Sequence, residues 1–209
     1  MVTERPKRRD AALNNERLVQ AAREVFARDG LAATLEDIAA HAGVGVGTIY
    51  RNFASKREII ETLYDAAIDS ALADVEHALQ IEDPWDALVT FFEVAAARQA
   101  ADRGLRETLP GHTGSGPNRD TSEKLLAALS PLFDRAHAAG ILRAGITVTD
   151  ITPIFAMLNG IYGMSETQPE LWRRYLALML DGLRSVDRPA LPVPALDIAA
   201  FQTALGAGH

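Results

Sequence analysis

Apolar residues recur every three or four positions along most of the chain, which is the spacing of a helix that buries one face. Runs that alternate apolar and polar residues, as half-buried strands do, do not occur in the sequence. We therefore expect an all-α protein. The pattern predicts helices over residues 15–28, 56–80, 84–102, 120–139, 150–164 and 169–186, a short segment at 104–109, and at 196–205 either a docking helix or a frayed tail.

Residues 34–53 have the pattern of two short helices joined by a tight turn. Thr34 is placed to cap the first helix, with Asp37 three residues later to bond back to the cap. Gly43 stands where the first helix must end and the chain must turn, a position that favours a residue without a Cβ. Ile49 then continues the apolar seam into the second helix. This arrangement predicts a helix-turn-helix, in which the second helix enters the major groove of DNA.

The outward face of the second helix carries Thr48, Tyr50, Arg51 and Asn52. These side chains offer hydrogen-bond donors and an aromatic ring of the types that contact phosphates and base edges. An ordinary helical hairpin needs the same apolar residues and the same turn glycine, and it remains the alternative. A merely solvated face would favour Glu and Lys instead.

Residues from about Asn15 to Glu61 resemble the DNA-binding domain of the tetracycline-repressor (TetR) family. The resemblance rests on the stretch Leu18–Gly30 and on Thr34, Ile38-Ala39, Ala42-Gly43-Val44, Gly47–Tyr50, Phe53 and Ser55-Lys56. It implies that residues 1–55 form an N-terminal helix-turn-helix domain of three helices with a basic arm. It also implies that residues 56–209 form a helical bundle that dimerises and binds a small-molecule effector.

Two positions depart from the usual pattern of this family, because Gly45 and Val46 stand where a small hydroxyl residue and a basic or polar residue are common. Neither side chain donates a hydrogen bond, although Val46 is able to meet a thymine methyl group. We expect sequence choice to depend on Thr48, Arg51 and Asn52, with Arg51 facing a guanine. The complete set of expected DNA contacts is Thr34, Gly45, Val46, Thr48, Tyr50, Arg51, Asn52 and Lys56, of which Thr34, Tyr50 and Lys56 hold phosphates.

The charge is divided along the chain in a way that supports this assignment. Residues 1–60 hold ten Lys or Arg against eight Asp or Glu, whereas the whole chain has a net charge of −7. One locally basic end is enough to dock phosphates while the acidic remainder faces away. Arg5, Lys7, Arg8 and Arg9 form either a flexible arm that reaches DNA or a solvated, disordered terminus.

The resemblance places an effector pocket in the body, where few charged residues point inward, so we expect an apolar or aromatic effector. The expected lining comes from the connecting helix, from the middle helices and from the loop at 110–117. It consists of Leu63, Ala67, Phe91, Phe92, Ala95, His112, Leu129, Phe133, Met157 and Tyr162.

The helices at 150–164 and 169–186 have apolar stripes wider than one packed face needs, and this width predicts a homodimer interface. A dimer presents two reading helices to a palindromic operator and so multiplies specificity. The alternative is that these residues form only the core of one protomer. The expected interface consists of Ile154, Leu158, Ile161, Trp172, Tyr175, Leu176, Met179 and Leu183.

Nothing in the sequence has the spacing of an enzyme site, a metal site or a cofactor site. The five histidines are scattered, the chain has no cysteine, and neither a nucleophile elbow nor a phosphate-binding loop is present. There is no secretory signal and no run of eighteen apolar residues, so we expect a cytoplasmic protein without a membrane partner. We therefore expect a ligand-responsive transcriptional regulator that acts as a repressor. The alternative is a helical ligand-binding or catalytic protein whose helix-turn-helix lookalike is only structural.

Overall fold

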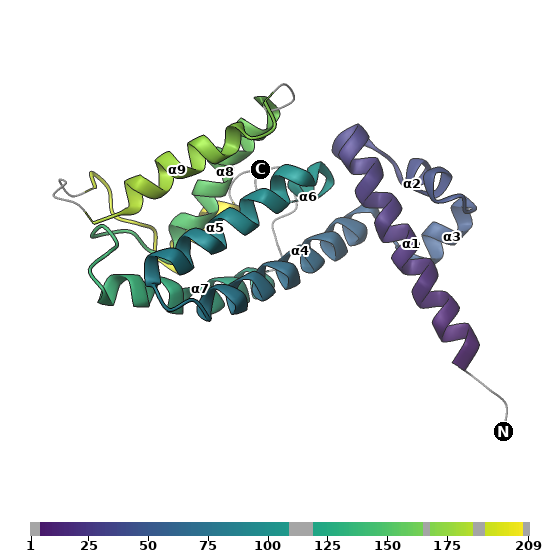
Figure 1. Cartoon of the computed structure of the whole chain (residues 1–209). Coiled ribbons are helices and arrows are strands. Elements are labelled where there is room, and N and C mark those ends of the chain that lie inside the picture. The colour runs from purple at the N-terminus through teal and green to yellow at the C-terminus, as the bar shows by residue number, and fades with distance from the viewer. Residues whose placement is uncertain (1–4, 109–118, 165–167, 186–190, 207–209) are drawn as a thin grey trace. The chain divides into compact units, whose positions relative to one another are not determined.

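The computed structural model of the chain describes residues 5–108, 119–164, 168–185 and 191–206, and within them the backbone is mainly helical (Figure 1). This confirms the all-α prediction. Apart from the helices, an isolated antiparallel bridge joins Leu142 to Arg184. The elements are α1 (Arg5–Asp29), η1 (Gly30–Ala32), α2 (Leu35–Ala42), α3 (Val46–Asn52), α4 (Lys56–Leu79), α5 (Pro84–Ala101), α6 (Arg103–Thr108), α7 (Arg119–Ala138), η2 (Val148–Asp150), α8 (Ile151–Met164), α9 (Leu171–Leu183) and α10 (Ile198–Gly206).

Helix α1 begins at Arg5, ten residues before the expected start at residue 15. The backbone at Arg5, Lys7, Arg8 and Arg9 is therefore helical, and the flexible or disordered arm expected there is not what the structure has. The apolar pattern did not reveal this part of the helix, because the first residues of α1 are mostly polar and have no apolar stripe at helical spacing.

The chain divides into two compact units that do not follow the expected boundary at residue 55. The first unit comprises residues 1–66 and 102–115, and the second comprises 67–101 and 116–209. Helix α4 begins in the first unit and ends in the second, and α6 belongs with α1, α2 and α3 although α5 precedes it. The first unit is thus assembled from two separate stretches of sequence.

The first unit packs α2 and α6 against α1, and α3 against α2. Its core consists of apolar side chains from α1, α2, α3 and the start of α4, together with Ala33 and Phe53 from the segments between helices. The buried members are Leu18, Ala21, Ala22, Val25, Phe26, Ala33, Leu35, Ile38, Ala39, Ile49, Phe53, Ile59, Ile60 and Leu63. The inner face predicted for the first helix is confirmed by Leu18, Ala21, Ala22, Val25 and Phe26.

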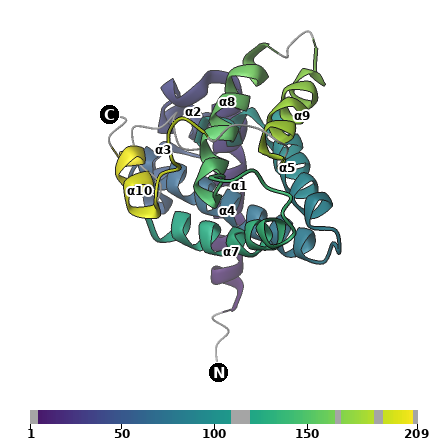
Figure 2. The same ribbon diagram turned by 90° about the vertical axis from the view of Figure 1, so that its left-hand side faces the viewer.

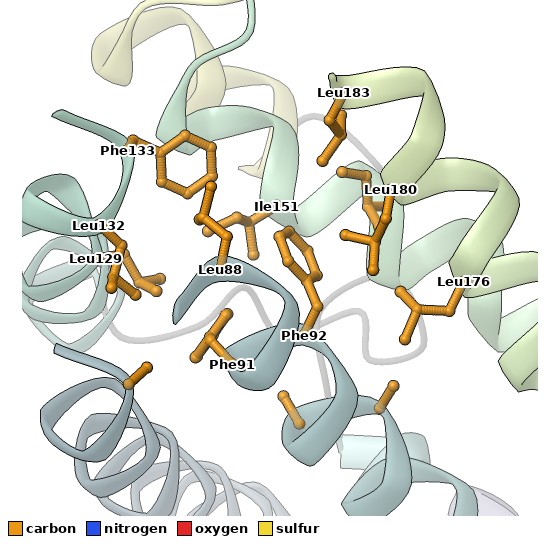
Figure 3. Close-up of a cluster of buried hydrophobic side chains, with 14 of the residues drawn as sticks. Leu88, Phe91, Phe92, Leu129, Leu132, Phe133, Ile151, Leu176, Leu180 and Leu183 are labelled. Carbon is orange, nitrogen blue, oxygen red and sulfur yellow. The ribbon is translucent and has the colours of Figure 1, made fainter. Parts of the chain in front are cut away.

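The second unit has a core in which α5 packs against α7, α8 and α9, and α8 packs against α9. Figure 3 shows side chains from these four helices pointing toward one another. The ring centroids of Phe91 and Phe92 lie 5.7 Å apart in an edge-to-face arrangement, and the Phe92 ring stacks on the Phe155 ring. Burial of these aromatic side chains, together with the aliphatic ones around them, stabilises the unit.

Two polar contacts fix the end of α4 within this unit. The Arg135 guanidinium on α7 donates hydrogen bonds to the carbonyls of Leu79, Ile81 and Glu82, where α4 ends and the next loop begins. Arg98 on α5 forms an ion pair with Asp74 on α4 at 2.7 Å. Burial raises the pKa of Asp74 above its ordinary value, against the opposite effect of Arg98.

The end of the chain forms a helix, so the docking alternative is the one that the structure bears out. Helix α10 (yellow in Figure 2) buries Phe201, and the Thr149 hydroxyl donates a hydrogen bond to the Leu196 carbonyl at 2.8 Å. Within the described parts of the chain, no helix combines the length and the apolar character needed to cross a membrane.

Candidate nucleic-acid interface

Helix α2 is set by a capping box at its start and a glycine turn at its end. The Thr34 backbone N–H donates to the Asp37 carboxylate at 2.8 Å, and the Asp37 N–H donates back to the Thr34 hydroxyl at 3.2 Å. Gly43 has φ +68° and ψ +32°, the left-handed conformation, and the N–H of Val44 donates to the carbonyl of Ala39. Both local predictions are confirmed, and together they set where the second helix of the motif begins.

Helix α3 exposes both apolar and polar side chains and has one buried residue, Ile49, that anchors it. Ile49 is completely buried, whereas Val46 is 44% exposed and Tyr50 is 48% exposed. Gly45 precedes the helix with an extended backbone, and its carbonyl accepts a hydrogen bond from the N–H of Thr48. The exposed side of α3 therefore offers an apolar surface at Val46 and a hydroxyl-bearing ring at Tyr50.

The expected base-reading side chains are folded along their own helix. The Arg51 guanidinium donates to the Gly47 carbonyl at 3.0 Å and to the Thr48 hydroxyl at 3.1 Å. The Asn52 amide donates to the Thr48 carbonyl at 2.7 Å. These bonds hold Arg51 and Asn52 in defined positions, and a base edge would have to exchange with them.

Tyr50 has a partner on the first helix of the motif. Its hydroxyl donates a hydrogen bond to Oε1 of Glu36 at 2.9 Å, which links α3 to α2. Hydrogen bonds lower the pKa of Glu36. The largest effect comes from the backbone N–H of Glu36 itself, and the next comes from the Tyr50 hydroxyl. The same bond raises the pKa of Tyr50, so the phenol stays protonated at neutral pH.

Lys56 lies at the start of α4, where its ammonium donates to the carbonyl of Leu31 and lies 6.0 Å from the centre of the Phe26 ring. It is half-buried, so its position also stabilises the first unit. The Glu58 N–H donates to the Ser55 hydroxyl at 3.3 Å, and the Glu58 carboxylate accepts from the Ala54 N–H. The start of α4 is therefore capped within the chain, as the pattern of Ser55 and Glu58 predicted.

Models of two protein domains match the chain. Bacterial regulatory proteins of the tetR family match residues 18–63, and the C-terminal domain of SbtR-like transcriptional regulators matches residues 83–185. The crystal structure of the TetR transcriptional regulator SCO0520 from Streptomyces coelicolor is 35% identical, covers 82% of this chain and 99% of that chain, and has a TM-score of 0.54. The chain belongs to the TetR family of transcriptional regulators.

Other relatives are consistent with this TetR-family membership. The HTH-type transcriptional regulator SAR0097 of Staphylococcus aureus is 25% identical over 143 residues, which are 65% of this chain and 75% of that protein. FadR from Bacillus subtilis, crystallised with stearoyl-CoA, shares the fold at 20% identity and a TM-score of 0.63, over 80% of this chain and 98% of that chain. The family and these relatives are DNA-binding transcriptional regulators and not enzymes, so the catalytic alternative is set aside.

The residues expected to line an effector pocket do not all lie together in this TetR-family chain. Phe91, Phe92, Ala95, Leu129, Phe133 and Tyr162 lie together in the core of the second unit. Their side chains pack on one another, and the Tyr162 hydroxyl donates to the Ala96 carbonyl. Ala67 is half-buried on α4, and His112 lies outside the described residues.

Two of the expected lining residues are placed elsewhere. Leu63 is buried in the core of the first unit with Ile59 and Ile60, because the part of α4 before residue 67 belongs to that unit. Met157 is 54% exposed, whereas Ile154 and Leu158 beside it on α8 are buried. Periodicity identified both as apolar positions, but it does not say which core, if any, covers them.

A cavity of about 250 Å³ opens between α5 and α9 of the second unit, and none of the expected lining residues borders it. Its floor is apolar, and its rim is charged. The Arg184 guanidinium stacks on the Trp85 ring at 4.6 Å within this cleft. The lining residues are Trp85, Val89, Glu93, Arg173, Leu176, Ala177, Leu180, Asp181 and Arg184.

Most residues expected at the dimer interface lie in the core of the protomer instead. Ile154, Leu158, Trp172, Leu176 and Leu183 are buried within the second unit, and Ile161, Tyr175 and Met179 are partly buried against them. The alternative of a protomer core holds for the five buried residues, because α5 already covers their side of α8 and α9. The large hydrophobic residues of these helices that are exposed are Met157, Met164 and Leu178.

Two contacts were not anticipated from the sequence. Glu36 meets Tyr50 across fourteen positions, and no periodic pattern signals such a pair. Gly104 of α6 lies against the Arg23 carbonyl of α1, beside an ion pair between Arg23 and Asp102 at 3.5 Å. An isolated glycine early in a short helix was the available signal for the second contact.

Proposed function

We propose that this TetR-family regulator is a ligand-responsive repressor that binds a palindromic operator as a homodimer. The observation that carries the DNA part is α3, which exposes Val46 and Tyr50 over the buried anchor Ile49. Thr48, Arg51 and Asn52 read bases, Val46 is able to meet a thymine methyl group, and Thr34, Tyr50 and Lys56 contact the phosphates of the DNA. An operator-binding protein acts where the chromosome lies, which places it in the cytoplasm.

We infer a two-fold dimer in which the outer faces of α8 and α9 meet those of a second copy. Met157, Gly160 and Met164 are exposed on α8, and Leu178 is exposed on α9. Exposed Met and Leu side chains beside a glycine suit close helix packing. A dimer is also what a palindrome requires, because each half-site takes one α3.

The effector that we propose is apolar or aromatic and binds in the second unit. The apolar side chains of α5, α7 and α8 support this chemistry, since a molecule that enters among them meets few polar groups. FadR, of the same fold, holds stearoyl-CoA. The effector releases the operator if it binds more tightly to the arrangement that DNA does not select.

Two chain connections between the units and one helix–helix contact support a coupling between effector binding and DNA binding. Helix α4 continues from the first unit into the second, and α5 leads directly into α6. Helix α6 in turn packs on α1. A displacement of α4 or α5 on effector binding is therefore passed to helices that hold the reading motif.

The test is selection of bound DNA from a random pool with the purified full-length protein. An inverted repeat is expected, and the Arg51→Ala variant should lose discrimination at one base pair of each half-site, by about 1–3 kcal/mol. A selected single half-site would contradict the dimer, and no enrichment would contradict operator binding. Compounds that raise the thermal midpoint of the protein, from a panel of apolar and matched polar molecules, are then expected to release the selected duplex.

A further inference from the structure

The hydrogen bond between Tyr50 and Glu36 is made at the surface of the reading motif. Tyr50 is about half exposed and Glu36 is exposed, and neither belongs to the core of the first unit. Ile38, Ala39 and Ile49, which are completely buried, pack α2 against α3. The two helices therefore also have apolar contacts with each other, and this surface bond is accessible to another acceptor.

The Glu36 carboxylate is chemically close to the group that DNA would bring to Tyr50. A phosphate oxygen and a carboxylate oxygen are both anionic acceptors, and a hydroxyl donor bonds to either with the strength of a charge-assisted hydrogen bond. The lowered pKa of Glu36 keeps its carboxylate charged at neutral pH, and the raised pKa of Tyr50 keeps its donor proton. The pair thus persists over the working pH range of a DNA-binding protein.

We propose that Glu36 competes with DNA for the hydroxyl of Tyr50, so that the operator backbone binds this hydroxyl only by displacing the Glu36 carboxylate. The proposal rests on the phosphate contact assigned to Tyr50 under the proposed function. Displacement costs the Tyr50–Glu36 bond and leaves a carboxylate beside a phosphate, which like-charge repulsion disfavours. Glu36 in this way lowers the affinity for DNA of any sequence that places a phosphate at Tyr50.

The competition makes a prediction that a purely structural role does not. Removing the charge of Glu36 should tighten binding when Tyr50 has its hydroxyl and should do little when the hydroxyl is absent. It should also make the dependence of binding on salt steeper, because the Glu36 carboxylate no longer offsets part of the positive charge that the protein brings to the DNA. A residue that merely stabilised α2 would change the unfolding midpoint rather than the salt slope.

The experiment compares Glu36→Gln, Tyr50→Phe and the double variant of the full chain, by filter binding to the selected operator duplex and to a scrambled duplex across a salt series. Glu16→Gln is the matched control, because it removes an exposed carboxylate from α1 in the same compact unit. We expect Glu36→Gln to tighten operator binding about fivefold. In the Tyr50→Phe background the same change should give less than twofold.

Each other outcome overturns the proposal for an identifiable reason. Equal tightening in both Tyr50 backgrounds, or from Glu16→Gln, would mean that only net charge matters. Weaker binding by Glu36→Gln would mean that Glu36 orients Tyr50 toward DNA instead of competing for it. If Tyr50→Phe alone left operator binding unchanged, the phosphate contact would fail and the competition with it, whereas loss of an inverted repeat in the selection would contradict only the dimeric repressor. Thermal unfolding of every variant separates these outcomes from misfolding.

Discussion

Gly104 on α6 lies directly against the backbone carbonyl of Arg23 on α1, in a space that has no room for a Cβ. A side chain on residue 104 would overlap the Arg23 oxygen, which belongs to the backbone of a long helix and does not move aside cheaply. The close approach of α6 to α1 therefore depends on the absence of a side chain at this position, and it is the packed contact through which we propose that the second unit influences the first.

Substitution of Gly104 by Ala should separate α6 from α1. We expect the free energy of unfolding to fall by about 1–3 kcal/mol, because the added methyl group overpacks a buried contact. The affinity for the operator should change less when an effector is added, since α6 no longer packs closely on α1. Chemical unfolding and operator release by an effector found in the compound panel measure the two effects.

Gly182→Ala on α9 is the control for this experiment, because a Cβ there meets open space. It should keep or slightly raise stability, as Ala does in place of Gly within a helix. An equal loss of stability in both variants, or a Gly104→Ala protein as stable and as responsive as the parent, would contradict the role given to this contact.

The two glycines of the reading motif should respond to the same substitution with opposite signs. Gly43 has φ +68°, where an alanine costs about 1–2 kcal/mol, although no neighbour obstructs a side chain. Gly47 lies within α3 with open space around it, and alanine there should stabilise by about 0.5–1 kcal/mol. Urea unfolding of both variants measures the difference, and a Gly43→Ala protein as stable as Gly47→Ala would be inconsistent with the left-handed turn.

The proposed dimer makes its own prediction at the exposed apolar residues of α8 and α9. Met157 is 54% exposed and Leu178 is 58% exposed, so the double change to Glu should leave the protomer folded while it introduces charge into the interface. We expect a monomer in sedimentation and at least about tenfold weaker binding to the inverted repeat, because two half-sites are no longer held together.

Val94→Glu, an exposed apolar position on α5, is the matched control and should remain dimeric.

Trp172→Ala tests whether this residue, expected at the dimer interface, belongs to the core of the protomer instead. Because Trp172 is buried in the protomer, its loss should cost about 3–5 kcal/mol of folding stability. A dimer unaffected by the double change at Met157 and Leu178 would place the interface elsewhere.

Local signals in the sequence were sufficient for the reading motif. The bonds between Thr34 and Asp37 and the turn at Gly43 depend on residues within a few positions of one another, so spacing alone predicts them. The helices of the body were likewise predictable, because each buries a stripe with helical periodicity. Residues 5–14 lack such a stripe, and the first part of α1 was accordingly missed.

Tertiary relationships were not predictable in the same way. Periodicity shows that Leu158 and Trp172 need burial, but it does not distinguish the core of a protomer from a partner surface. It likewise did not show that Leu63 belongs to the first unit, because α4 is continuous across the boundary between the units. The Tyr50–Glu36 bond depends on how α2 and α3 cross, which the sequence spacing leaves open.

The return of α6 to the first unit has a consequence for engineering. The simplest design for a chimeric regulator has one junction, which joins the DNA-binding domain of one protein to the ligand-binding domain of another. Here a cut after residue 66 would leave α6 with the sensor, and Gly104 would then face a foreign helix in place of the Arg23 carbonyl. A working hybrid needs α6 to be exchanged together with residues 1–66, or a graft whose first helix accepts this glycine.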